Sequence, residues 1–285
     1  MHSSPLESTI EANRREAEGR ILDRVCPIYG INGRRQYQLI GSSVLLKVAS
    51  RSFVLTAAHG LYKNRDSTLY IAGGTDIVAL AGSSFRSGSP TANRDDDRLD
   101  FGFIEISDTP LDQWSRFRFL TPGDLDVDDI PVAESLYAFV GFPETRNRVL
   151  SGRRLQLNPV IETVMPTSLE RYPRLGLNPL AHFAGDFSLT RLNAQGKTAV
   201  GPKPHGLSGG GVWRLGTFHE LATCTNAEKL IGLGIEYRSN PSVLVAVRIS
   251  AVVALLTDTH PELAGYLPAP TRASFLSSIP GVGTS

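Results

Sequence analysis

The sequence is poor in cysteine and has no long apolar run. Only two of its 285 residues are cysteines, Cys26 and Cys224, and two are too few for the framework of a disulfide-rich secreted domain. No uninterrupted apolar segment approaches the ~20 residues that a transmembrane helix needs. The His and Cys spacings offer no zinc site. We therefore expect neither a metal nor a cofactor.

A dominant charge is also missing. The chain has 29 Lys and Arg against 28 Asp and Glu, a formal net charge of +1. Proteins that bind nucleic acids or acidic membranes by electrostatics usually carry a marked excess of basic residues. We therefore expect neither a nucleic acid nor a membrane as partner.

What the chain has is glycine, proline and short apolar segments. It contains 27 Gly and 18 Pro, and 41% of its residues are hydrophobic. Short, partly alternating segments at 44–48, 53–55, 69–71 and 77–80 predict strands. This is the pattern of an all-β sandwich or barrel.

Four segments are expected along the chain. Residues 1–24 have apolar residues at roughly helical spacing among charges, which predicts an amphipathic helix rather than a secretion signal. Residues 25–120 and 121–260 are two sets of strands, joined by the acidic loop 124–130. Residues 251–257 are expected to begin a C-terminal helix. Residues 261–285, rich in Pro, Ser and Gly, are expected to be a flexible tail.

Three motifs carry possible chemistry. Thr56-Ala57-Ala58-His59 ends an apolar strand, Asp100 opens another, and Ser208 lies in the run Gly206-Leu207-Ser208-Gly209-Gly210-Gly211. The order His, Asp, Ser is one of the known orders of the Ser-His-Asp triad.

Each residue type suits that chemistry. A serine hydroxyl needs a base to become a nucleophile, and histidine titrates in the range where it can take and return the proton. A carboxylate then fixes the imidazole tautomer. The N–H groups of Gly206 and Ser208 are candidates for an oxyanion hole. Asp95, Asp96 and Asp97 compete for the carboxylate role, and we favour Asp100 because apolar neighbours on both sides would bury it.

Together these motifs resemble the chymotrypsin/trypsin-like serine peptidases. His59 and Asp100 are 41 residues apart, and Asp100 and Ser208 are 108 apart, intervals usual in that family. The resemblance extends over roughly 25–256, including 41–46, 140–143, 230–237 and 241–247. It implies two packed six-stranded antiparallel β-barrels, here with N- and C-terminal helices, and a serine endopeptidase that acts on proteins or peptides through an acyl-enzyme.

Two departures from the family pattern bear on location and activation. Gly60 stands where secreted relatives begin the disulfide of the histidine loop. The resemblance is therefore to a bacterial, intracellular-looking member, and we expect a cytoplasmic protein with free thiols. Leu207 stands where zymogens hold the aspartate that pairs with a new N-terminus. The site is then either preformed or opened by an activating partner or ligand.

The resemblance also suggests residues for substrate binding. Pro202 occupies the position of the aspartate that binds Lys or Arg, so a trypsin-like preference is not supported. Lys203 and His205 line the same approach, Glu236 could favour a basic side chain at a neighbouring subsite, and the other candidates are Ile235, Tyr237, Ser242 and Val243.

Two other functions stay open at this point. Gly206-Leu207-Ser208-Gly209-Gly210 fits the Gly-x-Ser-x-Gly of α/β-hydrolase esterases, with Asp258 and His260 following in the order of that fold. A catalytically silent peptidase fold used for binding is the third possibility. A β-dominated fold argues against the esterase, and labelling by a fluorophosphonate distinguishes an active serine hydrolase from a silent one.

Overall fold

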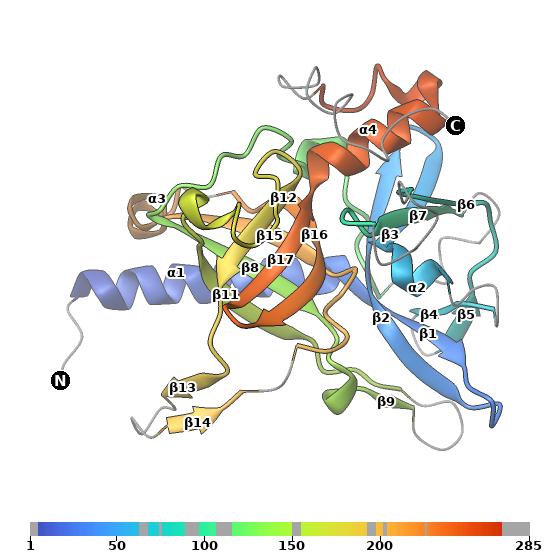
Figure 1. Cartoon of the computed structure of the whole chain (residues 1–285), viewed down its shortest axis with the longest axis horizontal. Coiled ribbons are helices and arrows are strands. Elements are labelled where there is room, and N and C mark those ends of the chain that lie inside the picture. Colours follow the sequence, from blue (N-terminus) through green and yellow to red (C-terminus); the bar gives the residue numbers. More distant parts are fainter. Residues whose placement is uncertain are drawn as a thin grey trace.

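The chain folds into two β-structures that lie side by side, with helices at both ends (Figure 1). The structure, a computed structural model, describes residues 5–62, 68–73, 76–88, 97–106, 116–149, 155–192, 198–201, 204–225 and 227–269. Within them, no helix is both long and apolar enough to cross a membrane.

The first half is one antiparallel sheet in the order β5-β4-β1-β2-β3-β7-β6. Its strands are β1 (Val25–Ile31), β2 (Tyr37–Val48), β3 (Arg51–Ala57), β4 (Tyr70–Gly73), β5 (Asp76–Ala79), β6 (Ser84–Arg86) and β7 (Phe101–Glu105). β5 and β6 have only four and three residues and form no ladder with each other in the described part of this half. This half therefore differs from the closed six-stranded barrel that we expected.

The second half is a closed barrel in the order β11-β12-β17-β16-β15-β8, as expected. Its strands are β8 (Ser135–Gly141), β11 (Val160–Pro166), β12 (His182–Asp186), β15 (Gly211–Thr217), β16 (Lys229–Ser239) and β17 (Ser242–Arg248). Two hairpins extend from it: β9 (Arg148–Val149) with β10 (Leu155–Gln156), and β13 (Thr190–Leu192) with β14 (Thr198–Val200).

Alternating and continuous apolar runs explain these strands. β3 has six successive buried positions because side chains on both of its faces are covered. In the barrel, Trp213, Tyr137 and Phe183 are fully buried. The rings of Tyr137 in β8 and Phe183 in β12 pack in a tilted arrangement with 4.6 Å between their centroids. Burial of such large side chains is the main favourable contribution to the stability of each half.

The linker between the halves contacts both of them. Lys47 N–H of β2 donates to Leu120 O, and Asp126 N–H donates to Leu230 O of β16. The short 3-10 helix η5 (Pro122–Asp124) brings Asp124 to within 3.3 Å of Arg24. The linker thus pairs with strands of both sides, which fixes the position of one half relative to the other.

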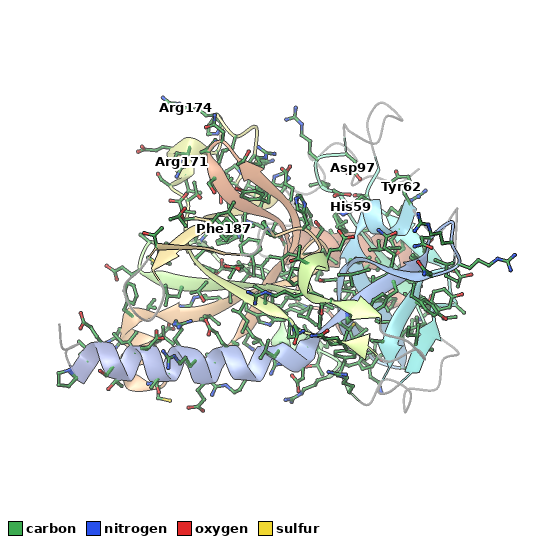
Figure 2. The ribbon with its side chains drawn as sticks, turned by 90° about the horizontal axis from the view of Figure 1, so that it is seen from below. His59, Tyr62, Asp97, Arg171, Arg174 and Phe187 are labelled. Atoms are coloured by element: carbon green, nitrogen blue, oxygen red, sulfur yellow. The ribbon has the colours of Figure 1, made fainter. Side chains whose placement is uncertain are left out.

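The terminal helices pack on the outside of the strands. α1 (Pro5–Ile21) continues into the 3-10 helix η1 (Leu22–Arg24), which agrees with the expected helical segment 1–24 from residue 5 on; residues 1–4 lie outside the described residues. Ala17 and Ile21 of α1 are buried, and Asn13 Nδ2 donates to Leu221 O of α3 (Phe218–Thr223) at 2.6 Å. In Figure 2, α1 runs along the side of the molecule opposite to His59.

The C-terminal segment is folded further than expected. α4 (Ile249–Thr259) confirms the expected helix, and the 3-10 helix η9 (Pro261–Leu263) follows it. Leu263 and Leu267 are only 2% and 7% exposed. The expected tail 261–285 therefore includes a packed piece up to residue 269, because these two leucines find apolar partners, and residues 270–285 lie outside the described residues. The other short helices in the described part of the chain are α2 (Ala58–Tyr62), η6 (Glu144–Arg146) and η8 (Leu169–Arg171).

Candidate active site

His59 and Asp100 form a close pair in the first half. β3 ends at Ala57, and the next residues turn into α2, which carries His59. His59 Nδ1 lies 2.6 Å from Asp100 Oδ2, and His59 N–H donates to Asp100 Oδ1 at 2.9 Å. Because a carboxylate only accepts, Nδ1 carries the proton and Nε2 is left as the basic nitrogen. The structure thus brings together the two residues that the motifs singled out.

Asp100 has an unusual backbone conformation. Its φ is +41°, in the left-handed region that residues with a side chain rarely adopt. Its side chain is 22% exposed, so apolar flanks bury it only partly. Its carbonyl accepts the N–H of Ala58 at 2.9 Å, which ties the residue to the start of α2. Contact with His59, rather than full burial, distinguishes Asp100 from Asp97.

Asp97 has a different role from Asp100. Its Oδ1 accepts the N–H groups of Leu99 (3.2 Å) and Asp100 (3.1 Å), and its Oδ2 accepts the hydroxyl of Ser87 (2.8 Å). Burial raises the pKa of this carboxyl, while the Ser87 hydroxyl lowers it. Asp97 therefore stabilises the turn that presents Asp100. Asp95 and Asp96 lie outside the described residues.

Ser208 lies on a tight turn that enters β15. Gly206 and Gly209 have φ of +96° and +82°, values that glycine adopts without strain. A Cβ at Gly209 would lie 2.1 Å from Ser42 O and 2.2 Å from Thr56 Oγ1. Ser42 N–H of β2 donates to Ser208 O at 2.9 Å. The serine turn of the second half is thus held directly against a strand of the first half.

The Ser208 hydroxyl points toward β16. Its Oγ donates to the carbonyl of Ile235 at 3.1 Å. In the part of the chain that the structure describes, no hydrogen bond joins this hydroxyl to His59. Catalytic hydrogen bonds are often long or misaligned before substrate binds.

Two backbone N–H groups beside Ser208 remain available. Neither Gly206 N–H nor Ser208 N–H donates to another described residue. Glu144 N–H donates to His205 O at 3.0 Å. Because carbonyl and N–H of a trans peptide point in opposite directions, this bond directs Gly206 N–H away from Glu144. A pair of uncommitted N–H groups is what an oxyanion hole requires.

Leu207 is a packing residue. It is 5% exposed, and its Cδ2 lies 3.0 Å from the place where a Cβ on Gly141 of β8 would be. Its N–H donates to Pro204 O at 3.1 Å, and its carbonyl accepts Gly210 N–H at 2.9 Å. The turn is thus supported by apolar contact and main-chain hydrogen bonds, with no ion pair at this position.

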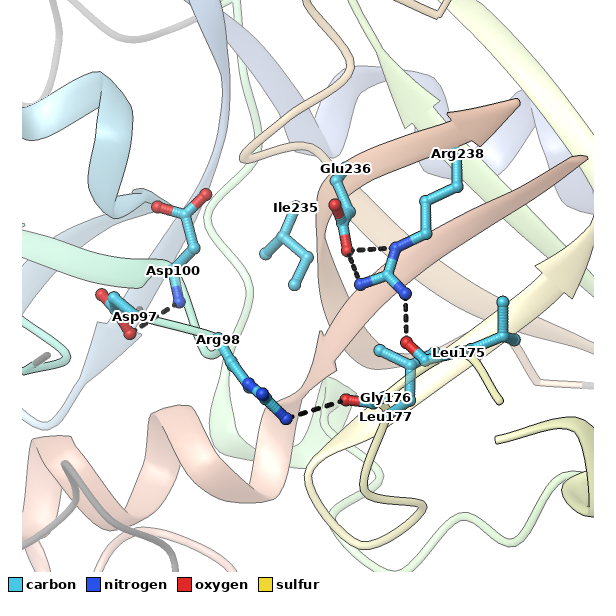
Figure 3. A pocket seen from close by; sticks show the side chains of 9 residues that line it. All are labelled: Asp97, Arg98, Asp100, Leu175, Gly176, Leu177, Ile235, Glu236 and Arg238. Carbon is cyan, nitrogen blue, oxygen red and sulfur yellow. Dashed lines mark hydrogen bonds and ion pairs between the residues drawn. The ribbon is translucent and has the colours of Figure 1, made fainter. Parts of the chain in front are cut away.

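A cavity of about 440 Å³ lies beside Asp100, between the two halves (Figure 3). The cavity is lined by Asp97, Arg98, Asp100, Leu175, Gly176, Leu177, Ile235, Glu236 and Arg238. Arg238 pairs with the Glu236 carboxylate and also donates to the Leu175 carbonyl. Arg98 Nη1 reaches across from the Asp97–Asp100 turn to the carbonyl of Gly176 at 3.4 Å.

Some of the expected substrate-binding residues line the cavity, and others do not. Ile235 and Glu236 line the cavity, whereas Tyr237 packs on Phe187 at 5.5 Å between ring centroids. Val243 is fully buried in β17, and Ser242 O accepts the N–H of Phe187 at 3.2 Å.

On the serine turn, His205 is exposed, and Pro202 and Lys203 lie outside the described residues. Sequence reasoning missed Arg98 and Arg238, because neither belongs to a motif and only the fold brings them together.

Comparison with known proteins identifies a similar fold among solved structures and no similar family or curated sequence. No protein-family model matches the chain, and no curated protein matches it. Among solved structures, it is similar to neuropsin, a serine protease expressed in the limbic system of mouse brain, with a TM-score of 0.53 and 16% identity. The match covers 84% of this chain and 94% of the other.

The fold is that of the trypsin-like serine proteases. At 16% identity the likeness concerns architecture alone, since unrelated functions can share one fold. The antiparallel sheets contradict the α/β-hydrolase alternative, which needs a parallel sheet flanked by helices. Consistently, His260 of that alternative packs at 5.6 Å from Phe53 and 5.5 Å from Phe85, in the core of the first half.

Proposed function

We propose that the protein is a serine endopeptidase with Ser208 as nucleophile, His59 as general base and Asp100 as the residue that orients the base. The observation that carries the proposal is the His59–Asp100 pair at 2.6 Å, together with a serine turn held against the same half of the molecule. The trypsin-like fold, which the chain shares with a solved serine protease, supports it.

In the proposed mechanism, Ser208 Oγ leaves Ile235 O and turns to His59 Nε2, which takes its proton as Oγ attacks the substrate carbonyl. The carbonyl oxygen gains a negative charge, which the N–H groups of Gly206 and Ser208 stabilise. The imidazolium then protonates the leaving amine, and an acyl-enzyme remains on Ser208. Water, deprotonated by His59, releases the acid product and restores the serine.

Substrate binding is proposed along β16 and the turn before Ser208. Ile235 and Glu236 lie on the strand beside the cavity, and His205 is exposed on the turn. The Glu236 carboxylate is already paired with Arg238, so its charge is compensated and gives no support to a basic preference. Tyr237 lies on the same strand, and Ser242 and Val243 lie on β17, which pairs with it. Pro202 and Lys203 remain candidates of the sequence alone.

We further propose a cytoplasmic location with reduced thiols. Cys26 is fully buried and Cys224 is exposed, and both are free. Burial raises the pKa of the Cys26 thiol to about 12, which keeps it protonated and unreactive. The fold is thus complete without a disulfide, as a reducing compartment requires. An activating partner that turns Ser208 toward His59 remains part of the proposal.

A fluorophosphonate probe tests the proposal, because it reacts with the activated serine of a serine hydrolase. We expect labelling of the wild-type protein and none of Ser208→Ala, which should fold normally because it loses only one half-exposed hydroxyl. A silent binding protein of this fold would give no labelling in either protein. A comparison of new protein N-termini in cells with wild-type and Ser208→Ala protein then identifies the substrates.

A further inference from the structure

The turn that carries Asp100 is held from both halves of the molecule. In the first half, the Asp97 carboxylate accepts hydrogen bonds from two N–H groups of the turn, and the Ser87 hydroxyl donates to the same carboxylate. On the side of the second half, Nε2 of His182 in β12 lies 2.9 Å from the carbonyl of Arg98. This contact joins residues that are 84 positions apart in the sequence.

The hydrogen-bond partners define the tautomer of His182. A carbonyl oxygen only accepts, so Nε2 carries the proton and donates it to Arg98 O. Nδ1 lies 3.1 Å from both the N–H and the carbonyl oxygen of Asn178, and in the neutral ring it accepts from that N–H. His182 is 3% exposed, and its two hydrogen bonds are partly buried. Burial also lowers the pKa of His182, which favours this neutral form.

The backbone around His182 is itself fixed. His182 pairs with Val247 of β17 in the barrel ladder. Arg248 Nε donates to the carbonyls of His182 (3.1 Å) and Pro179 (2.8 Å). A side chain on such a rigid support can hold a neighbouring loop in one position.

The Asp100 turn needs such support. Asp100 has a positive φ, a conformation that persists only when its surroundings impose it. The Arg98 carbonyl is two residues from Asp100, within the same turn. If His182 did not donate to it, this partly buried carbonyl would lose its partner in the second half, and the turn would be free to shift. Such a movement would carry the Asp100 carboxylate away from His59.

We infer that His182 is a positioning residue: from the second half it holds the Arg98 carbonyl and thereby fixes the turn that presents Asp100 to His59. The inference rests on the proposed role of the His59–Asp100 pair. It follows that the second half, which carries Ser208, is needed to keep His59 and Asp100 of the first half in their present geometry. The two halves would then have to be docked for the base to be oriented.

Two conservative variants separate the two bonds of His182. The amide nitrogen of glutamine reaches about as far as Nε2, so His182→Gln should still donate to Arg98 O. The asparagine amide reaches only as far as Nδ1, so His182→Asn should lose that bond. Val247→Ala removes packing at the paired position and serves as a control for destabilisation alone.

The measurements are the kinetics of peptide hydrolysis, the melting temperature and the NMR resonance of His59 Nδ1–H, which a short bond to a carboxylate moves downfield. For His182→Asn we expect kcat to fall by about 10-fold with little change in KM, the size of losing one hydrogen bond. The Nδ1–H resonance should move upfield or exchange away. His182→Gln and Val247→Ala should keep both the resonance and kcat within about threefold of wild type.

The inference is overturned if His182→Asn keeps the wild-type kcat and resonance, if His182→Gln is impaired equally, or if Val247→Ala produces the same losses. The NMR measurement needs no turnover. If Ser208→Ala shows that the protein is no hydrolase, the resonance still decides the role of His182. The two proposals can therefore fail separately.

Discussion

Replacing Asp100 by asparagine tests how the base is oriented. In the structure one carboxylate serves two donors, His59 Nδ1–H at 2.6 Å and His59 N–H at 2.9 Å. An amide has only one oxygen. If that oxygen accepts the backbone N–H, the NH₂ group faces Nδ1, and the imidazole must accept there and carry its proton on Nε2. Nε2 could then no longer take the proton of Ser208.

The expected loss for Asp100→Asn is large, while the fold is kept. A wrong imidazole tautomer costs about 10⁴-fold in kcat in triad enzymes, equivalent to about 5.4 kcal/mol of transition-state stabilisation. The assay is kcat/KM on a peptide substrate, with the rate of fluorophosphonate labelling as a second readout. The melting temperature should change little, because the amide is nearly isosteric with the carboxylate.

The matched control is Asp97→Asn, three residues upstream. Asp97 contacts the turn rather than His59, and an amide oxygen can still accept from Leu99 or Asp100. We expect a loss of about 10-fold or less, together with a lower melting temperature. If Asp100→Asn stays within 10-fold of wild type while Asp97→Asn loses activity, the assignment of the triad carboxylate is wrong.

Three further changes test other parts of the account. Gly209→Ala places a methyl group 2.1 Å from Ser42 O at a residue with a positive φ. We therefore expect a free energy of unfolding in urea that is lower by at least ~2 kcal/mol, and no labelling by the fluorophosphonate. Wild-type stability and labelling would refute the turn geometry. Burial raises the pKa of Asp129 to about 6, so its contribution to stability is present below about pH 4 and lost as pH rises through 6. The free energy of unfolding of the wild type, relative to that of Asp129→Asn, should fall by about 2–3 kcal/mol between pH 4 and 7. A difference that does not depend on pH would contradict this. Cys26→Ser with Cys224→Ser should retain activity and cause only the small loss of one buried thiol, and a large melting-temperature drop on reduction of the wild type would argue for a disulfide instead.

The sequence was sufficient where chemistry needs contiguous residues. The Gly206–Gly211 run predicts a turn because its glycines adopt positive φ, and the structure has that turn. His59 at a strand end and Asp100 before the next strand follow from apolar periodicity. β3 and β7 are neighbours in the sheet, which brings the two residues together.

The sequence was insufficient where the determining contacts are between distant segments. Apolar flanks suggested a buried Asp100, but the more buried carboxylate is Asp97, since a side-chain cap of the turn is not visible in local pattern. His182 and Arg98 meet only after both halves have folded. Closure of the first sheet likewise depends on strand lengths that motifs do not specify.

The central claim is tested most directly by mapping the site of fluorophosphonate labelling. Wild-type protein is treated with the probe and digested, and the modified peptide is identified by mass spectrometry. We predict a single adduct on Ser208, abolished in Ser208→Ala and at least 10³-fold slower in His59→Ala. An adduct on another residue, or labelling of Ser208 at an unchanged rate in His59→Ala, would contradict the account.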